Sequence, residues 1–136
     1  MVEITIVNQG SEIARVAGLL DRLGAERHLA TEIVSDMQIA LDEVLSNITK
    51  YAFTDDAEHE IHIGFQVFND VLEAAIEDDG APFDPLALPA PDLSAALPER
   101  RLGGVGIHFV RSLMDEVAYE RAGERNRLVL RKRFKT

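Results

Sequence analysis

Three short stretches of the chain combine residue types and spacings that could bind ions and move protons. The first is Asp42-Glu43-Val44-Leu45-Ser46-Asn47, in which Glu43 and Asn47 are four residues apart. On a helix this spacing places the two side chains on one face, one turn apart. A carboxamide oxygen can bind Mg²⁺, and a carboxylate can accept or polarise the proton of a hydroxyl group. Taken alone, the pair fits a cation site and also an ordinary solvated helix surface.

The second stretch, residues 76–85, directly follows a predicted strand and reads Ile-Glu-Asp-Asp-Gly-Ala-Pro-Phe-Asp-Pro. A carboxylate at a strand end, here Asp78, can accept a hydrogen bond from an exocyclic amine such as that of adenine. Gly80 then lets the backbone approach the ring closely. Asp-Gly is also common turn chemistry, but the pattern through Phe83 and Pro85 is longer than a turn requires.

The third stretch, Gly103-Gly104-Val105-Gly106-Ile107, opens a predicted helix. Free N–H groups and the helix dipole at such a start favour an anion, and Arg100 and Arg101 just upstream could add positive charge. The spacing is not that of a dinucleotide fingerprint, and no Gly-Lys-Ser/Thr follows, which excludes a Walker loop. A flexible hinge is the alternative interpretation.

The elements that must position these stretches follow from hydrophobic periodicity and turn residues. Ser11 is a candidate cap for the first helix, and Asn69-Asp70 is a candidate hairpin turn. The expected order is a strand at 4–7, helices at about 12–23 and 30–52, strands at about 60–68 and 71–77, a helix from about 104, and strands at about 116–121 and 127–134. This mixture predicts a two-layer α/β (α+β) sandwich with a mixed, mostly antiparallel sheet.

Composition narrows the function classes. The chain has 136 residues, which suits a single domain, and no cysteine, which excludes disulfides and thiol nucleophiles. Its net charge of −10 argues against nucleic-acid binding, and the bases gathered near the C-terminus fit the solvated face of a strand. We find no signal peptide and no membrane-spanning window, so a cytoplasmic location without membrane contact is expected.

All five prolines lie between Asp78 and Gly104, in a loop whose length suggests function.

Together, the three stretches and their order resemble the GHKL superfamily, which includes gyrase-type ATPases, histidine kinases and anti-sigma-factor serine kinases. The anti-sigma branch is the closest match. It shares Pro-Phe-Asp-Pro at 82–85, Gly-Gly-x-Gly-hydrophobic at 103–107, Met-Asp-Glu-Val at 114–117 and the Gly-x-x-Asn turn of Gly123 and Asn126. The resemblance covers Ile4 to Phe134 and implies one histidine-kinase-like ATP-binding domain over residues 1–136, with helices on one face of the sheet and an ATP lid at about 81–103.

The resemblance also implies roles for individual residues. Glu43 would be the catalytic carboxylate, Asn47 would hold Mg²⁺, and Asp78 would bind the adenine amine above Gly80. Arg15 on the first helix is a candidate contact for a protein partner. The remaining residues of the implied nucleotide site are Lys50, Phe83, Arg101, Gly104, Val105 and Gly106.

The implied function is that of an anti-sigma factor and Mg-ATP-dependent protein serine/threonine kinase. It would phosphorylate a STAS-type anti-sigma antagonist, sequester a sigma factor in a partner switch, and form a homodimer. An ATP-gated binding module without useful kinase activity is the alternative. A histidine-kinase fragment is disfavoured because no histidine lies in an upstream phosphoacceptor helix, and His59 and His62 are interpreted as surface residues and not as a metal site.

Overall fold

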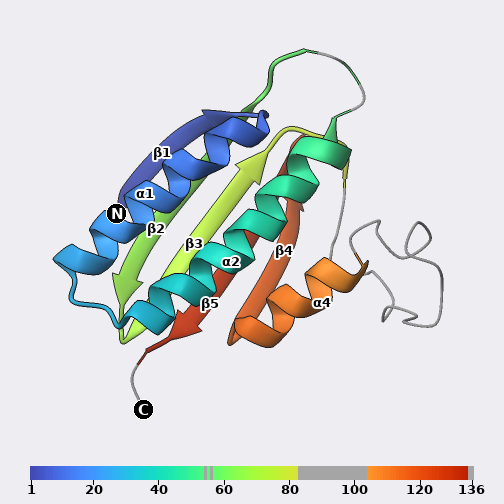
Figure 1. Cartoon of the computed structure of the whole chain (residues 1–136). Coiled ribbons are helices and arrows are strands. Elements are labelled where there is room, and N and C mark those ends of the chain that lie inside the picture. The colour runs from blue at the N-terminus through green and yellow to red at the C-terminus, as the bar shows by residue number, and fades with distance from the viewer. Residues whose placement is uncertain (54, 56, 83–103, 135–136) are drawn as a thin grey trace.

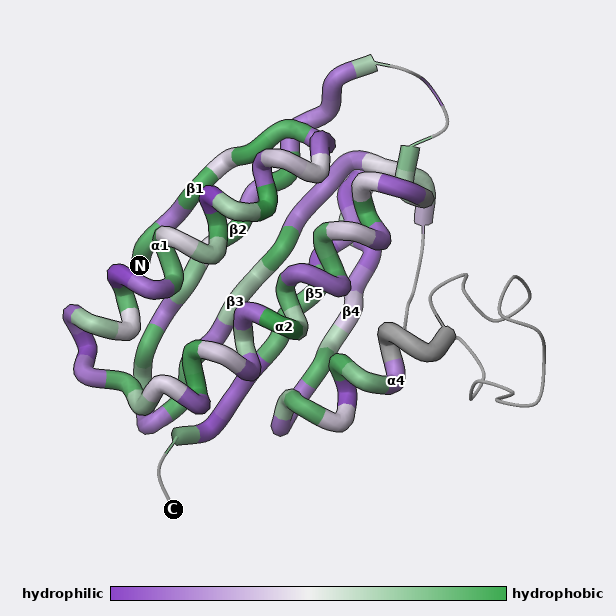
Figure 2. Tube along the Cα trace, viewed as in Figure 1, coloured by the Kyte–Doolittle hydropathy of each residue, from purple (hydrophilic) through white to green (hydrophobic). Residues whose placement is uncertain are grey.

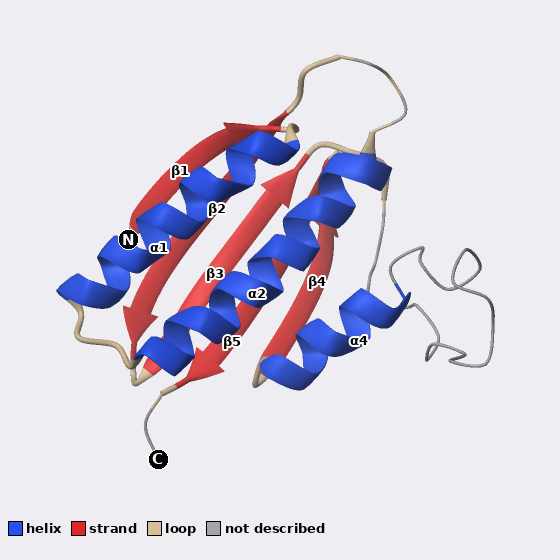
Figure 3. Ribbon diagram, in the orientation of Figure 1, coloured by secondary structure: helices blue, strands red, loops and turns tan. Residues whose placement is uncertain are grey.

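A computed structural model describes residues 1–53, 55, 57–82 and 104–134, with side chains except those of Tyr51 and residues 104–107. In this part of the chain, helices cover one face of a β-sheet (Figures 1 and 3). Along the chain the elements are β1 (Val2–Val7), a 3₁₀ turn (Gly10–Glu12), α1 (Ile13–Glu26), α2 (Thr31–Asn47), a π-helical turn (Ile48–Ala52), β2 (Glu60–Phe68), β3 (Val71–Asp78), α4 (Gly104–Leu113), β4 (Glu116–Ala122) and β5 (Arg125–Arg133).

The sheet has the strand order β1-β2-β3-β5-β4, so β5 lies between β3 and β4. The two-layer α/β (α+β) sandwich is therefore confirmed, and every pairing among the described strands is antiparallel. Asn69 and Asp70 form the predicted β2–β3 turn, with φ of 49° and 62°. Both angles are positive, as a two-residue type I′ turn requires. Gly123, with φ of 61°, turns β4 into β5.

The core lies between the sheet and the helices, because apolar residues alternate along the strands and recur on one side of each helix (Figure 2). The largest fully buried side chains come from both layers: Phe65, Ile6, Leu20, Met37, Leu45, Ile61, Ile63, Leu72, Ile76, Leu130, Val16 and Val110. The helices must approach closely where α1 meets α2. There, a Cβ on Gly24 would lie 2.5 Å from a methyl carbon of Val34.

Two arginines of β5, Arg127 and Arg131, are paired with glutamates on the outer face of the sheet. Arg131 Nε lies 2.7 Å from Glu73 Oε2, its Nη1 lies 2.9 Å from Glu116 Oε2, and Arg127 Nε lies 3.4 Å from Glu77 Oε1. The hydrogen bond that Arg131 donates to Glu73, followed by the one it donates to Glu116, raises the pKa of Arg131. These arginines therefore belong to a solvated, charge-paired strand face, as the sequence indicated.

Two helix termini differ from expectation. Ser11 does not cap α1, because it lies inside the 3₁₀ turn; no side-chain cap bond is made there. Instead Glu12 Oε1 accepts hydrogen bonds from the Val7 N–H at 3.3 Å and from Arg15 Nη1 at 3.0 Å, which anchors the start of α1 to the end of β1. The second helix does not continue as an α-helix to Ala52 but changes to π-helical geometry after Asn47.

No helix in the described part of the chain combines the length and the apolar composition needed to cross a membrane.

A histidine links the segment before β2 to the residue that follows β3. The His59 Nε2 lies 2.7 Å from Asp55 Oδ1, and its Nδ1 lies 3.3 Å from Asp79 Oδ1. The ring stacks on Phe53 with centroids 4.1 Å apart. The hydrogen bond from His59 Nε2 to the Asp55 carboxylate raises the pKa of His59 against the opposing effect of burial, and the same bond lowers the pKa of Asp55.

This link predicts a pH-dependent contribution to stability. Because its folded-state pKa is raised, protonated His59 stabilises the fold below its unfolded pKa, and the stabilisation disappears as the pH rises through the raised value. At the acidic end it disappears again as the pH falls through the lowered pKa of Asp55. We expect the melting temperature of the wild type to exceed that of His59→Gln most in mildly acidic solution. Melting curves from about pH 5 to about pH 9 measure this difference. A difference that does not vary with pH would show that the contact is not ionic.

Candidate functional site

Asn47 ends α2 with a buried amide. The side chain is only 8% exposed, and its Nδ2 has no hydrogen-bond partner among the described residues. Leaving a buried amide unpaired costs about 1–3 kcal/mol, and native structures rarely tolerate this without a reason. The residue also sits where α2 changes to the π-helical turn, a geometry that is frequent at functional sites. A ligand that pairs with this amide would remove the cost, so the position fits a binding role.

Glu43 lies one turn before Asn47 on α2 and is half-buried. Its neighbours in the sequence, Val44 and Leu45, face the core, which places the Glu43–Asn47 pair at the edge of the hydrophobic layer. No described residue forms a hydrogen bond or an ion pair with the Glu43 carboxylate. The carboxylate is therefore available to a proton donor from outside the fold.

The end of β3 carries the second predicted stretch. Asp78 is 3% exposed, and its Oδ1 accepts hydrogen bonds from the Gly80 N–H at 2.8 Å and from Asn126 Nδ2 at 3.0 Å. A Cβ on Gly80 would lie 2.6 Å from the Ala52 carbonyl oxygen and 2.7 Å from the Ala52 Cβ. The Ala81 N–H donates to the same carbonyl oxygen at 2.9 Å. The turn after β3 is thus packed against the π-helical turn, which brings the first and second stretches together.

The third stretch begins α4, whose first turn contains Gly104, Val105 and Gly106. Helix α4 packs against α2 and runs beside it in the opposite direction, so its first turn points toward the end of the sandwich where α2 and β3 end (Figure 1). Phe83 and Arg101 lie outside the described residues, as does the expected lid at 81–103 apart from Ala81 and Pro82.

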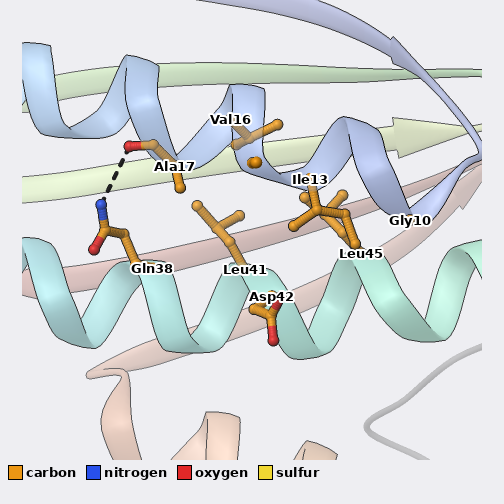
Figure 4. Close-up of a pocket in the computed structure, with 9 residues that line it drawn as sticks. Gly10, Ile13, Val16, Ala17, Gln38, Leu41, Asp42 and Leu45 are labelled. Atoms are coloured by element: carbon orange, nitrogen blue, oxygen red, sulfur yellow. Dashed lines mark hydrogen bonds between the residues drawn. The ribbon is translucent and has the colours of Figure 1, made fainter.

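Two further predicted residues lie at the surface. Lys50 is exposed on the π-helical turn, after Asn47. Arg15 is 55% exposed on α1 and pairs with Glu12. Near Arg15, on the flank of α2 that faces α1, lies a hollow of about 290 Å³ (Figure 4). Its lining is mostly apolar and comprises Gly10, Ile13, Ala14, Val16, Ala17, Gln38, Leu41, Asp42 and Leu45. The hollow shares Asp42 and Leu45 with the first stretch, but neither Glu43 nor Asn47 lines it.

Sequence reasoning assigned no site role to Asn126, Arg121 and Tyr119. Asn126 is 6% exposed and faces Asp78 across β5 and β3, where the two residues are register partners. Arg121 Nη1 donates to the Gly80 carbonyl oxygen at 2.8 Å. The Gly-x-x-Asn turn and the predicted hairpin are signals that mark Asn126, but only the pairing of β5 with β3 brings it to Asp78.

The arrangement suits a nucleotide with a divalent cation. A buried carboxylate, a close glycine backbone, an unpaired amide and a glycine-rich helix start gather at one end of the sandwich. The carboxylate offers an acceptor for an amine, the glycine backbone offers room for a ring, and the helix start offers N–H groups for an anion. The Asn47 carboxamide offers its oxygen as a ligand for a cation and its unpaired Nδ2 as a donor to an oxygen of the ligand. Among the described residues no cluster of three or more His, Asp or Glu side chains is arranged to hold a metal ion. A cation there would need phosphate oxygens or water as further ligands.

Comparisons with known proteins identify the family of the chain. The family model of the histidine kinase-like ATPase domain matches residues 7–132. The serine-protein kinase RsbW of Bacillus subtilis is 31% identical over 107 residues, which are 75% of this chain and 64% of that protein. The serine-protein kinase RsbW of Listeria monocytogenes is 28% identical over 106 residues, 75% of this chain and 65% of the relative. The chain thus spans just under two thirds of the length of these curated relatives.

Solved structures share the fold at low sequence identity. The RsbU and RsbW domains of a Mycobacterium tuberculosis protein superpose with a TM-score of 0.67 at 14% identity, covering 97% of this chain and 31% of that chain. The histidine kinase AdeS of Acinetobacter baumannii gives 0.50 at 12% identity, covering 100% of this chain and 70% of that one. With the family match over residues 7–132 and the relatives named RsbW, the chain belongs to the histidine kinase-like ATPase domain family.

Proposed function

We propose that this chain is an ATP-dependent protein serine/threonine kinase that acts as an anti-sigma factor. The observation that carries the proposal is the buried Asn47 side chain, whose Nδ2 has no partner among the described residues, one helical turn from the Glu43 carboxylate, which likewise has none there. The serine-protein kinases RsbW among its relatives support the same reaction class. The resemblance to anti-sigma-factor kinases supports the regulatory role.

ATP would lie across the end of the sandwich. The Asp78 carboxylate would accept a hydrogen bond from the adenine amino group, while the Gly80 backbone approaches the ring. The N–H groups of the first turn of α4, at Gly104, Val105 and Gly106, would contact the phosphates, and Lys50 would add positive charge. The Asn47 carboxamide would hold Mg²⁺, which when bound neutralises charge on the phosphate oxygens during transfer. Positioning and electrostatics thus account for most of the expected catalysis.

Glu43 would act on the attacking group. Its carboxylate is half-buried and has no partner among the described residues, so it can accept the proton of a serine or threonine hydroxyl group or orient that group toward the γ-phosphorus. Its place one turn from Asn47 keeps the acceptor carboxylate beside the residue that would hold the cation.

The protein substrate would be a STAS-type antagonist, and the sequestered partner a sigma factor. The exposed side of α1 with Arg15 is the proposed docking surface, and the adjoining hollow between α1 and α2 would accept apolar side chains of the partner (Figure 4). We further propose that the chain acts as a homodimer. The nucleotide state would set which partner is held.

The function is tested by incubating the chain with γ-labelled Mg-ATP and its cognate antagonist. We expect label on one serine or threonine of the antagonist, removable by a protein phosphatase. Tight ATP binding with no label on the antagonist would instead support a nucleotide-gated binding module without kinase activity. Absence of ATP binding would contradict both.

A further inference from the structure

Both polar atoms of the Asn126 side chain form hydrogen bonds, the oxygen with donors and the nitrogen with acceptors. Its Oδ1 accepts hydrogen bonds from the Tyr119 hydroxyl at 2.5 Å and from Arg121 Nη1 at 3.2 Å. Its Nδ2 donates to Asp78 Oδ1 at 3.0 Å and to the Ala81 carbonyl oxygen at 2.9 Å. Because a carboxamide oxygen only accepts and its nitrogen only donates, donors around the oxygen and acceptors around the nitrogen allow a single orientation.

The same network fixes the Asp78 carboxylate. Oδ1 receives two donors, the Gly80 N–H at 2.8 Å and Asn126 Nδ2 at 3.0 Å. No described residue donates to Oδ2. Since both bonds converge on one oxygen of a side chain that is 3% exposed, the carboxylate cannot rotate without breaking them. The second oxygen is thereby left to a donor on the ligand.

Arg121 extends the network to the backbone beneath the proposed base site. Its Nη1 also donates to the Gly80 carbonyl oxygen at 2.8 Å, and its Nε donates to the Gly123 carbonyl oxygen at 3.1 Å. The β4–β5 turn and the turn after β3 are therefore joined through one guanidinium group. Tyr119 and Arg121 reach Asn126 from β4, so three strands contribute to the position of one carboxylate.

We infer that Asn126, oriented by Tyr119 and Arg121, is a positioning residue that makes the pocket select a base bearing an amino group. This inference rests on the proposed binding of ATP at Asp78. An adenine amino group donates to a fixed carboxylate oxygen, whereas a 6-oxo purine presents a carbonyl oxygen that the carboxylate repels. Discrimination between adenine and a 6-oxo purine requires that the Asp78 carboxylate cannot rotate away from the bound base. Without Asn126, Asp78 loses a donor and can adopt orientations that no longer distinguish the bases.

The test compares the affinities for ATP and inosine triphosphate, both with Mg²⁺, by isothermal titration. For Asn126→Leu we expect the Kd for ATP to rise about 10- to 100-fold, because that is the usual effect of losing a hydrogen bond to a charged group. The Kd for inosine triphosphate should change much less. The selectivity for ATP therefore falls. Arg125→Gln is the matched control, because Arg125 is exposed at the same hairpin and its side chain forms no hydrogen bond or ion pair with a described residue. Its selectivity should equal that of the wild type.

A milder variant keeps the inference testable if Asn126→Leu fails to fold. Tyr119→Phe removes one donor to Asn126 Oδ1 and retains the aromatic ring, so selectivity should fall in the same direction by about 3- to 10-fold, with an unchanged far-ultraviolet spectrum. Equal losses for both nucleotides, or unchanged selectivity in a folded variant, would overturn the inference while leaving the proposed function intact. A wild type that binds neither nucleotide would overturn both.

Discussion

Glu43→Gln is expected to slow phosphoryl transfer to the antagonist by about 10²- to 10⁴-fold, the usual contribution of a positioned general base. Glutamine keeps the size and polarity of the side chain but cannot accept the proton of the attacking hydroxyl. ATP affinity should stay near that of the wild type, because the proposed adenine and phosphate contacts come from other residues, Asp78 and the first turn of α4 among them. The measurement is the single-turnover rate with γ-labelled Mg-ATP, together with the Kd for Mg-ATP.

The matched control for this prediction is Glu32→Gln, which makes the same chemical change on the exposed first turn of the same helix. It should transfer phosphate at the wild-type rate. If Glu43→Gln transferred phosphate as fast as this control, Glu43 would not be the catalytic carboxylate. If it lost ATP binding along with transfer, its role would be in binding.

Asn47→Leu is expected to stabilise the protein in the absence of nucleotide and to abolish its response to Mg-ATP. Leucine fills a similar volume and removes the unpaired amide, which should raise the melting temperature by about 3–10 °C. Saturating Mg-ATP stabilises a binding protein by about 2.7 kcal/mol at a concentration of 100 Kd, and this gain should disappear in the variant. Thermal melts with and without Mg-ATP measure both effects. A stability rise that accompanies lost binding is the signature of a polar group retained for its ligand.

Ser46→Ala provides the control for Asn47→Leu, because Ser46 is the half-buried neighbour on the same turn and its hydroxyl forms no hydrogen bond with a described residue. This variant should keep the full thermal response to Mg-ATP. An Asn47→Leu protein that melted below the wild type, or that still responded fully to Mg-ATP, would contradict the assignment of Asn47 as the residue that holds the cation.

Local sequence patterns were sufficient for most of the fold. The alternation of Ile61, Ile63 and Phe65 predicted β2 with the bounds that the structure shows, and Asn69-Asp70 predicted the turn that follows. Period-2 and period-3.6 patterns carry this information because each reports which face of one element is buried. Helix ends were less predictable. Ser11 was expected to cap the first helix, but the side chain that forms hydrogen bonds at the start of α1 is that of Glu12, which reaches the end of β1.

The candidate site was predictable where it depends on spacing along one element and not where it depends on pairing. Glu43 and Asn47 share a helix face, so four residues of spacing were enough. The contact between Asp78 and Asn126 joins positions 48 residues apart, and it exists because β5 inserts beside β3. The contact of Gly80 with Ala52 depends on the π-helical turn, a local rearrangement that helical periodicity does not report.

The most direct test of the account is a ¹⁵N–¹H titration of the wild type with Mg-ATP. We expect the side-chain amide of Asn47 and the backbone amides of Gly80 and Gly106 to shift together along one saturation curve, because all three would contact the same nucleotide. Shifts confined to the hollow between α1 and α2, or no shifts at all, would contradict a nucleotide site at this end of the sandwich.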